Sequence, residues 1–157
     1  MDGYLGVDVG SVTTKCAIIT EAGELIADNY LLTQGKPVSA VQQGLREIQG
    51  QLPTDVRICG VCTTGSARYL AGVIVGADVV KNEITAQAVA ALYYVPDVHT
   101  VIEIGGQDSK LIVIRDGMVV DFAMNTVCAA GTGSFLDQQA LRLNMKIEDF
   151  GKQALQS

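Results

Sequence analysis

One pattern occurs twice in the sequence, and it constrains the fold more than any other feature. An apolar segment runs into a short turn of glycine, a carboxylate, a hydroxyl side chain and lysine, and another apolar segment follows. The first copy covers residues 6–15 and the second covers residues 103–110. A short polar turn between two apolar segments is typical of a β-hairpin. We therefore predict two hairpins whose tips carry the same chemistry.

The residue types at these tips indicate a phosphate site. Backbone N–H groups beside glycine, together with serine and threonine hydroxyls, can cradle phosphate oxygens. Asp8 would repel phosphate directly, so its presence indicates a magnesium ion between the two, because Mg²⁺ prefers oxygen ligands. Lys15 and Lys110 would neutralise phosphate charge. A plain turn between two strands would explain the first copy alone, but the second copy favours the phosphate site. Neither tip has the Walker A or the dinucleotide-binding spacing.

Apolar periodicity and turn residues divide the rest of the chain into short elements. We predict strands over residues 4–9, 15–20, 24–32, 56–61, 100–104, 109–114 and 118–122. We predict helices over residues 37–51, 67–72, 82–94, 131–144 and 146–156, with Asn82 or its neighbours capping the third. Residues 63–66 are predicted to form a polar loop. This order predicts an α/β fold.

Composition excludes several classes of protein. The 157 residues carry 17 acids against 11 lysines and arginines, for a net charge of −6. No basic stripe is visible, so we expect no nucleic-acid partner. With 48% hydrophobic residues the chain is too apolar for disorder. No apolar run approaches the ~20 residues of a membrane span, and the start has no basic signal-peptide region. We expect a cytoplasmic protein with reduced thiols and no membrane contact.

The two tips together resemble the phosphate motifs of the actin-like ATPase superfamily, which includes sugar kinases, Hsp70 and exopolyphosphatases. In that superfamily two ribonuclease-H-like halves clamp a nucleotide. The resemblance implies that ATP or ADP binds with Mg²⁺, and that Asp8 and Glu103 hold the metal. Glu103 stands where the second motif more often has aspartate. The implied nucleotide-binding residues are Gly10, Ser11, Thr13, Thr14, Lys15, Gly105, Gly106, Gln107, Asp108 and Lys110.

Glu83 begins the predicted helix upstream of the second motif. In the exopolyphosphatase branch of the superfamily, a glutamate at a similar place orients the attacking water. A carboxylate near the γ-phosphate can do this without strong basicity. The resemblance therefore implies a catalytic set of Glu83, Asp8 and Gln107. Alternatively, Glu83 is only a favourable residue at a helix N-terminus.

Cys128 precedes a glycine-rich helix start. A helix N-terminus favours the thiolate form of cysteine, and thiolates hold iron–sulfur clusters. Alternatively, Cys128 is a small buried residue packed among alanines. The Cys59–Cys62 pair has the spacing of a metal or redox motif. It falls on a predicted strand, where the two side chains point to opposite faces. We therefore assign this pair a structural role, and we place Cys16 in the core.

Residues 103–110 followed by residues 128–136 resemble the activators (component A) of 2-hydroxyacyl-CoA dehydratases and the ATPase subunits of benzoyl-CoA reductase. The resemblance runs from about residue 4 to residue 150. It implies a homodimer that shares one [4Fe-4S] cluster, with Cys128 as a ligand. It also implies that ATP hydrolysis drives a low-potential electron into a partner dehydratase or a related CoA-ester reductase. Each subunit of that family supplies a second cysteine, which we expect beyond residue 157.

These observations predict a ribonuclease-H-like domain with a mixed five-stranded sheet and flanking helices. We expect residues 1–157 to be a single half-domain, the N-terminal half of a two-lobed ATPase, and to be inactive without the second half. One alternative is a kinase or phosphatase of the same superfamily, in which Cys128 is structural. Another is a regulatory or scaffold fragment with no turnover.

Overall fold

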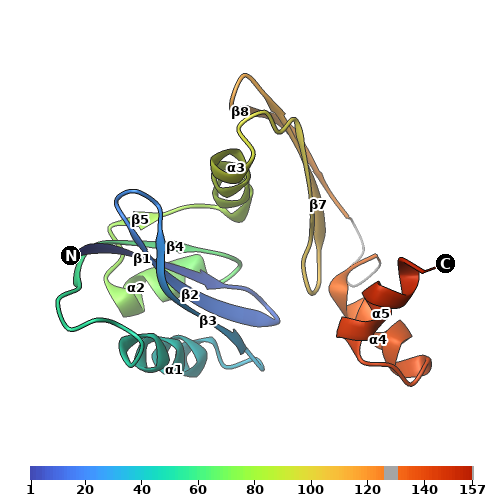
Figure 1. Ribbon diagram of the computed structural model, residues 1–157, viewed down its shortest axis with the longest axis horizontal. Helices are drawn as coiled ribbons and strands as arrows, with labels where there is room; N and C mark the ends of the chain where they lie inside the picture. Colours follow the sequence, from blue (N-terminus) through green and yellow to red (C-terminus); the bar gives the residue numbers. More distant parts are fainter. Residues whose placement is uncertain (126–130, 157) are drawn as a thin grey trace. The chain divides into compact units, whose positions relative to one another are not determined.

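The computed structural model describes residues 1–125 and 131–156. The chain divides into two compact units, Met1–Ala86 and Gln87–Ser157. Figure 1 shows the elements of both units, coloured along the sequence. No helix in the described ranges is long and apolar enough to cross a membrane.

The first unit is built on the mixed five-stranded sheet that the sequence predicts. Its strands are β1 (Asp2–Val9), β2 (Thr13–Thr20), β3 (Leu25–Leu32), β4 (Arg57–Thr64) and β5 (Val79–Val80). Their order is β3-β2-β1-β4-β5. The hairpin partners β1–β2 and β2–β3 are antiparallel, whereas β4 runs parallel to both β1 and β5. The central strand β1 therefore ends between the turn into β2 and the end of β4.

Two helices cover one face of this sheet, α1 (Pro37–Gln49) and α2 (Arg68–Val75), as Figure 1 shows. Proline suits the first turn of α1 because that position needs no N–H donor. Buried and exposed side chains alternate along β1, and the buried ones face these helices. The core of the unit consists of Leu5, Val7, Val9, Cys16, Ile18, Ala27, Val41, Ile48 and Ala71.

The helix α3 (Glu83–Tyr94) begins one residue after the predicted start. The side-chain oxygen of Asn82 accepts a hydrogen bond of 2.8 Å from the backbone N–H of Thr85. This is the geometry of an N-cap, so the predicted capping role of Asn82 is confirmed.

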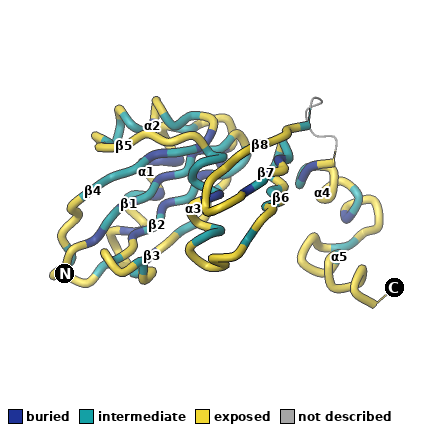
Figure 2. Tube along the Cα trace, turned by 90° about the horizontal axis from the view of Figure 1, so that it is seen from above, coloured by how far each residue is buried: buried dark blue, intermediate teal, exposed yellow. Residues whose placement is uncertain are grey.

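The second unit contains a three-stranded antiparallel sheet and two helices. The strands are β6 (Thr100–Ile104), β7 (Ser109–Arg115) and β8 (Met118–Met124), paired in that order. The helices are α4 (Gly133–Arg142) and α5 (Ile147–Ala154). Figure 2 shows that β7 carries buried residues, whereas β8 is exposed along its length. The turn between β7 and β8 has positive φ at Asp116 and Gly117, as in a tight two-residue hairpin.

Two predicted boundaries are wrong in a way that affects the site. Thr63 and Thr64 belong to β4 and not to a loop, because β4 continues its parallel pairing with β1 as far as Thr64. Apolar patterning missed this extension because these two strand residues are polar. The following helix starts at Arg68 and continues to Val75, beyond the predicted residues 67–72. The strand β5 was not predicted, since two residues carry no periodicity.

Candidate functional site

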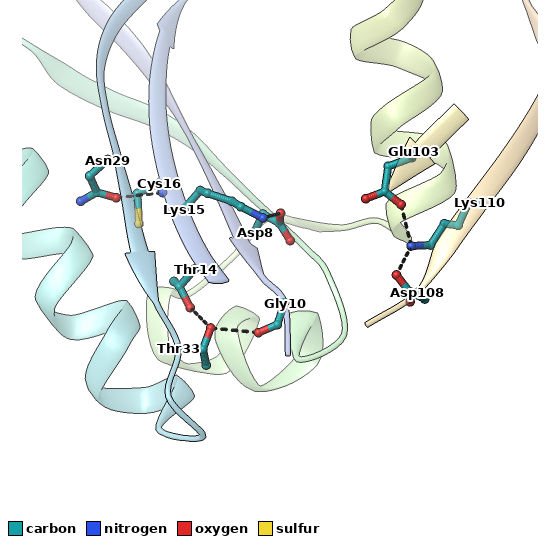
Figure 3. Close-up of polar contacts among 10 residues, drawn as sticks. All are labelled: Asp8, Gly10, Thr14, Lys15, Cys16, Asn29, Thr33, Glu103, Asp108 and Lys110. Atoms are coloured by element: carbon teal, nitrogen blue, oxygen red, sulfur yellow. Dashed lines mark hydrogen bonds and ion pairs between the residues drawn. The ribbon is translucent and has the colours of Figure 1, made fainter. Parts of the chain in front are cut away.

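The first hairpin tip is braced from inside by two threonines. The Gly10 N–H donates to the Thr13 carbonyl at 2.9 Å and closes the turn. The Thr33 hydroxyl donates to the Gly10 carbonyl at 3.0 Å and lies 2.9 Å from the Thr14 hydroxyl (Figure 3). A hydroxyl has one proton, so Thr14 is the donor to Thr33. Both threonines are buried. The Thr14 hydroxyl therefore supports the turn, while Ser11 is exposed at its tip.

The strands of this hairpin present a carboxylate and an ammonium group opposite one another. Asp8 on β1 is the register partner of Lys15 on β2, and Nζ lies 2.9 Å from Oδ2 (Figure 3). The lysine ammonium also lies 5.8 Å from the ring centre of Tyr30. The Asp8 and Lys15 side chains are 31% and 37% exposed. An ion pair this accessible contributes little to stability, and both groups can meet a ligand.

The end of β4 completes this corner of the first unit. Thr64 is the register partner of Asp8 on the parallel strand. The next residue, Gly65, has φ of +89°, and a Cβ there would overlap a carboxylate oxygen of Asp8. Only glycine fits a backbone that is both left-handed and this close to a side chain. Neither Thr64 nor Gly65 was among the predicted site residues, although both lie beside Asp8. The glycine directly after two hydroxyl residues was the signal that pointed to them.

The second hairpin tip repeats the carboxylate–lysine arrangement. Glu103 on β6 is the register partner of Lys110 on β7, and Nζ lies 2.9 Å from Oε2. The same ammonium lies 2.8 Å from a carboxylate oxygen of Asp108 (Figure 3). The Lys110 side chain is only 2% exposed. Its charge is balanced by two carboxylates, so its predicted contact with phosphate stays a prediction. Gln107 is exposed at this tip.

The turn of the second tip is hydrogen-bonded directly to the start of α4. The Gly133 N–H donates to the Gly105 carbonyl at 2.8 Å, and the Ser134 N–H donates to the Gly106 carbonyl at 3.2 Å. The Ser134 hydroxyl also donates to the Gly106 carbonyl. A Cβ at Gly133 would lie 3.2 Å from the Gly105 carbonyl oxygen. The turn and the first residues of α4 therefore form one hydrogen-bonded assembly.

The remaining predicted site residues are Glu83 and Cys128. Glu83 is the first residue of α3 and is partly buried. Cys128 lies outside the described residues. Among the residues that are described, no group of three or more His, Cys, Asp or Glu side chains could hold a metal ion.

The three cysteines that the structure describes are free thiols. Cys16 is buried, as predicted, and burial raises the pKa of its thiol to about 11, with a smaller contribution from Glu47. Cys59 is exposed and lies where the pairing of β1 with β4 shifts register. Cys62 is half-buried further along β4. A high pKa keeps Cys16 protonated and unreactive.

The family model and the similar proteins indicate the same family of ATPases. Residues 5–157 match the model of the BadF/BadG/BcrA/BcrD ATPase family. The chain is 35% identical to the (R)-2-hydroxyglutaryl-CoA dehydratase activating ATPase of Acidaminococcus fermentans, over 94% of this chain and 56% of that protein.

Two solved structures are similar along almost the whole chain. Component A of the Acidaminococcus fermentans dehydratase superposes with a TM-score of 0.86 at 34% identity, covering 100% of this chain and 60% of that one. The activator of 2-hydroxyisocaproyl-CoA dehydratase from Clostridium difficile, solved with bound ADPNP, also gives 0.86, at 28% identity. It covers 99% of this chain and 57% of that one. The chain spans about half the length of the relatives it matches. The predicted actin-like ATPase fold is confirmed.

Proposed function

Since this chain belongs to the BadF/BadG/BcrA/BcrD ATPase family, we propose that it is the N-terminal part of an ATP-driven activator. The activator delivers a low-potential electron to a 2-hydroxyacyl-CoA dehydratase or a related CoA-ester reductase. The observation that carries the proposal is the hydrogen bonding of the second hairpin tip to the start of α4. It gives a nucleotide-binding turn a direct mechanical connection to the helix that follows Cys128.

The nucleotide phosphates bind at the two tips. Backbone N–H groups of the tips and exposed hydroxyls donate hydrogen bonds to the phosphate oxygens, and Lys15 balances part of the phosphate charge. The chemistry of Asp8 fits a hydrated magnesium ion, since one of its oxygens faces Lys15 and the other lies against Gly65. Glu103 would supply a carboxylate ligand for the metal at the second tip. When bound, the metal neutralises phosphate charge in the transition state. The proposed nucleotide-binding residues are Gly10, Ser11, Thr13, Thr14, Lys15, Gly105, Gly106, Gln107, Asp108 and Lys110. Thr14 contributes by supporting the first turn from inside.

Three side chains act on the water and the γ-phosphate during hydrolysis. Glu83 accepts a hydrogen bond from the water and aligns it for attack. Asp8 acts on the surroundings of this water through its charge. Gln107 acts on them through hydrogen bonding. The expectation for Glu83 rests on its chemistry and its place ahead of the second motif.

The conformational change that accompanies hydrolysis is transmitted toward Cys128 through the second tip. Gly133 and Ser134 donate to the carbonyls of that turn, so a displacement of the turn displaces the start of α4. Cys128 immediately precedes this segment and binds an iron–sulfur cluster shared with a second copy of the protein. The cluster supplies one-electron chemistry when bound. The partner is the CoA-ester enzyme that receives the electron, and the protein works in the cytoplasm, where a free thiol such as Cys59 persists.

Anaerobic reconstitution of the native protein with iron and sulfide tests this proposal. We expect a brown protein with a four-iron spectroscopic signal, which Cys128→Ser abolishes and Cys59→Ser leaves unchanged. The reduced protein with MgATP should then activate a 2-hydroxyacyl-CoA dehydratase. A protein that takes up no iron and transfers phosphate to a small molecule would instead be a kinase or phosphatase of the same fold.

A further inference from the structure

A row of four side chains crosses the face of the first sheet that is opposite to α1 and α2. The register pairs are Tyr30 with Lys15, Lys15 with Asp8, and Asp8 with Thr64. Register partners on neighbouring strands point to the same face. Asp8 lies between Val7 and Val9, which are buried toward the helices, so the row faces the other way. Figure 3 shows Lys15 reaching from β2 to Asp8.

Thr64 differs from the other three members of this row, because Lys15 contacts both Asp8 and Tyr30. The hydroxyl oxygen of Thr64 is buried and has no hydrogen-bond partner among the described residues. The preceding residue behaves differently, because the Thr63 hydroxyl donates to the Arg68 carbonyl at 2.9 Å. Buried hydroxyls in folded proteins are normally hydrogen-bonded, so one that is not points to a ligand that completes it.

The neighbours of Thr64 define what that ligand can be. The Asp8 carboxylate next to it repels phosphate oxygens and attracts a cation. One Asp8 oxygen is bound to Lys15, and the other lies on the side of β4, against Gly65. A hydroxyl and a carboxylate side by side both accept hydrogen bonds. A ligand that offers protons to both is the water shell of a divalent cation, and Mg²⁺ keeps most of its waters when proteins bind it.

We propose that Thr64 binds the hydrated divalent cation of the nucleotide site, with Oγ1 accepting a hydrogen bond from a cation-bound water beside Asp8. The inference rests on the proposed function, because that function brings a metal–nucleotide complex to the first hairpin tip. It adds the end of β4 to a site that the two motifs alone had placed on hairpins.

The test compares Thr64→Val with Thr64→Ser in the native protein, with Mn²⁺ and ADP as the probe. Free Mn²⁺ is followed by its paramagnetic resonance signal, so the readout is affinity and not turnover. We expect Thr64→Val to weaken Mn²⁺ binding in the ADP complex roughly three- to tenfold, the effect of one lost hydrogen bond. Thr64→Ser keeps the hydroxyl and should bind like the wild type. Thr100→Val, the same substitution on β6, serves as the matched control.

A second measurement separates ligand binding from a structural role. Without ligand, Thr64→Val should unfold at the same urea concentration as the wild type or a higher one, because a methyl replaces an unpartnered hydroxyl. A Thr64→Val protein that is less stable, or that binds Mn²⁺ within twofold of the wild type, overturns the inference. If Asp8→Asn abolishes binding while Thr64→Val does not, the proposed function stands and the role of Thr64 falls. If the wild type binds no Mn²⁺ with ADP, the proposed function itself fails.

Discussion

Lys110 on β7 lies opposite Glu103 on β6, and its ammonium group donates a hydrogen bond of 2.9 Å to the Glu103 carboxylate. Lys15 and Asp8 have the same cross-strand geometry, the same distance and the same seven-residue separation on the first hairpin. The two pairs differ in burial, since the side chain of Lys110 is 2% exposed and that of Lys15 is 37% exposed. The same geometry therefore has different energetic consequences in the two units.

Lys110→Met should destabilise the second unit by about 2–4 kcal/mol, because it leaves two neighbouring carboxylates without their shared cation. Lys15→Met should cost less than about 1 kcal/mol, since its ion pair is exposed. Hydrogen exchange of peptides from β6 and β7, and from β1 and β2, measures each effect in its own unit. Equal losses of protection in the two variants would contradict this account.

Gly65→Ala should disturb Asp8, because the new methyl overlaps its carboxylate and the backbone is left-handed at this residue. We expect a loss of about 2–4 kcal/mol of stability and at least roughly tenfold weaker binding of ADP with Mn²⁺. Gly76→Ala is the matched control, since φ is +64° there but no atom lies within 4 Å of the added carbon. It should cost about 1–2 kcal/mol and leave nucleotide binding unchanged. Calorimetric titration and thermal melts distinguish the two variants.

The stability of the first unit should depend on pH through Cys16. Its thiol has a pKa of about 11 in the folded protein, raised mainly by burial, against an ordinary value of 9.0. The stabilisation is therefore complete below about pH 9 and is lost as the pH rises to about 11. The free energy of unfolding of the wild type, relative to Cys16→Ala, should fall by about 2–3 kcal/mol over this window. Urea unfolding at several pH values tests this, and a difference that does not change with pH would refute it.

Glu83→Gln separates the two interpretations of this residue. If Glu83 aligns the attacking water, the variant should hydrolyse ATP at least roughly a hundredfold more slowly and bind ADP with unchanged affinity. If it only favours a helix N-terminus, the change should cost a few tenths of a kcal/mol and leave turnover intact. Glu148→Gln, in the first turn of α5, is the control for the helix effect alone. Steady-state hydrolysis by the native protein gives the answer.

Local sequence patterns predicted most of the fold. Both hairpins and the Asn82 cap depend on contacts between residues close in sequence, and turn and capping residues mark them clearly. The strand β5 escaped prediction because its two residues gain their strand structure from pairing with β4. Patterns of apolar residues also ended β4 too early, since they do not register polar strand residues.

The site was harder to predict where it depends on distant parts of the chain. The pairing of Asp8 with Lys15 follows from one hairpin, and the pattern indicated both residues. The approach of Gly65 to Asp8 depends on the register between β1 and β4, which no local pattern encodes. From the sequence alone, Lys110 was predicted to neutralise phosphate charge, in the same way as Lys15. Its burial between two carboxylates emerges only when the strands and their turn are assembled.

The distance in sequence between the parts of the first corner also sets an order of assembly. Asp8 and Lys15 belong to one hairpin, whose closure fixes only a short loop and takes microseconds. Thr64 and Gly65 join them only when β4 docks in parallel beside β1, after α1 has formed, and the longer loop closes more slowly. We therefore expect an early folding species that has the carboxylate–lysine pair but lacks the glycine that holds the carboxylate in place. In such a species the first hairpin tip has formed, but its carboxylate is not yet positioned to bind a ligand selectively.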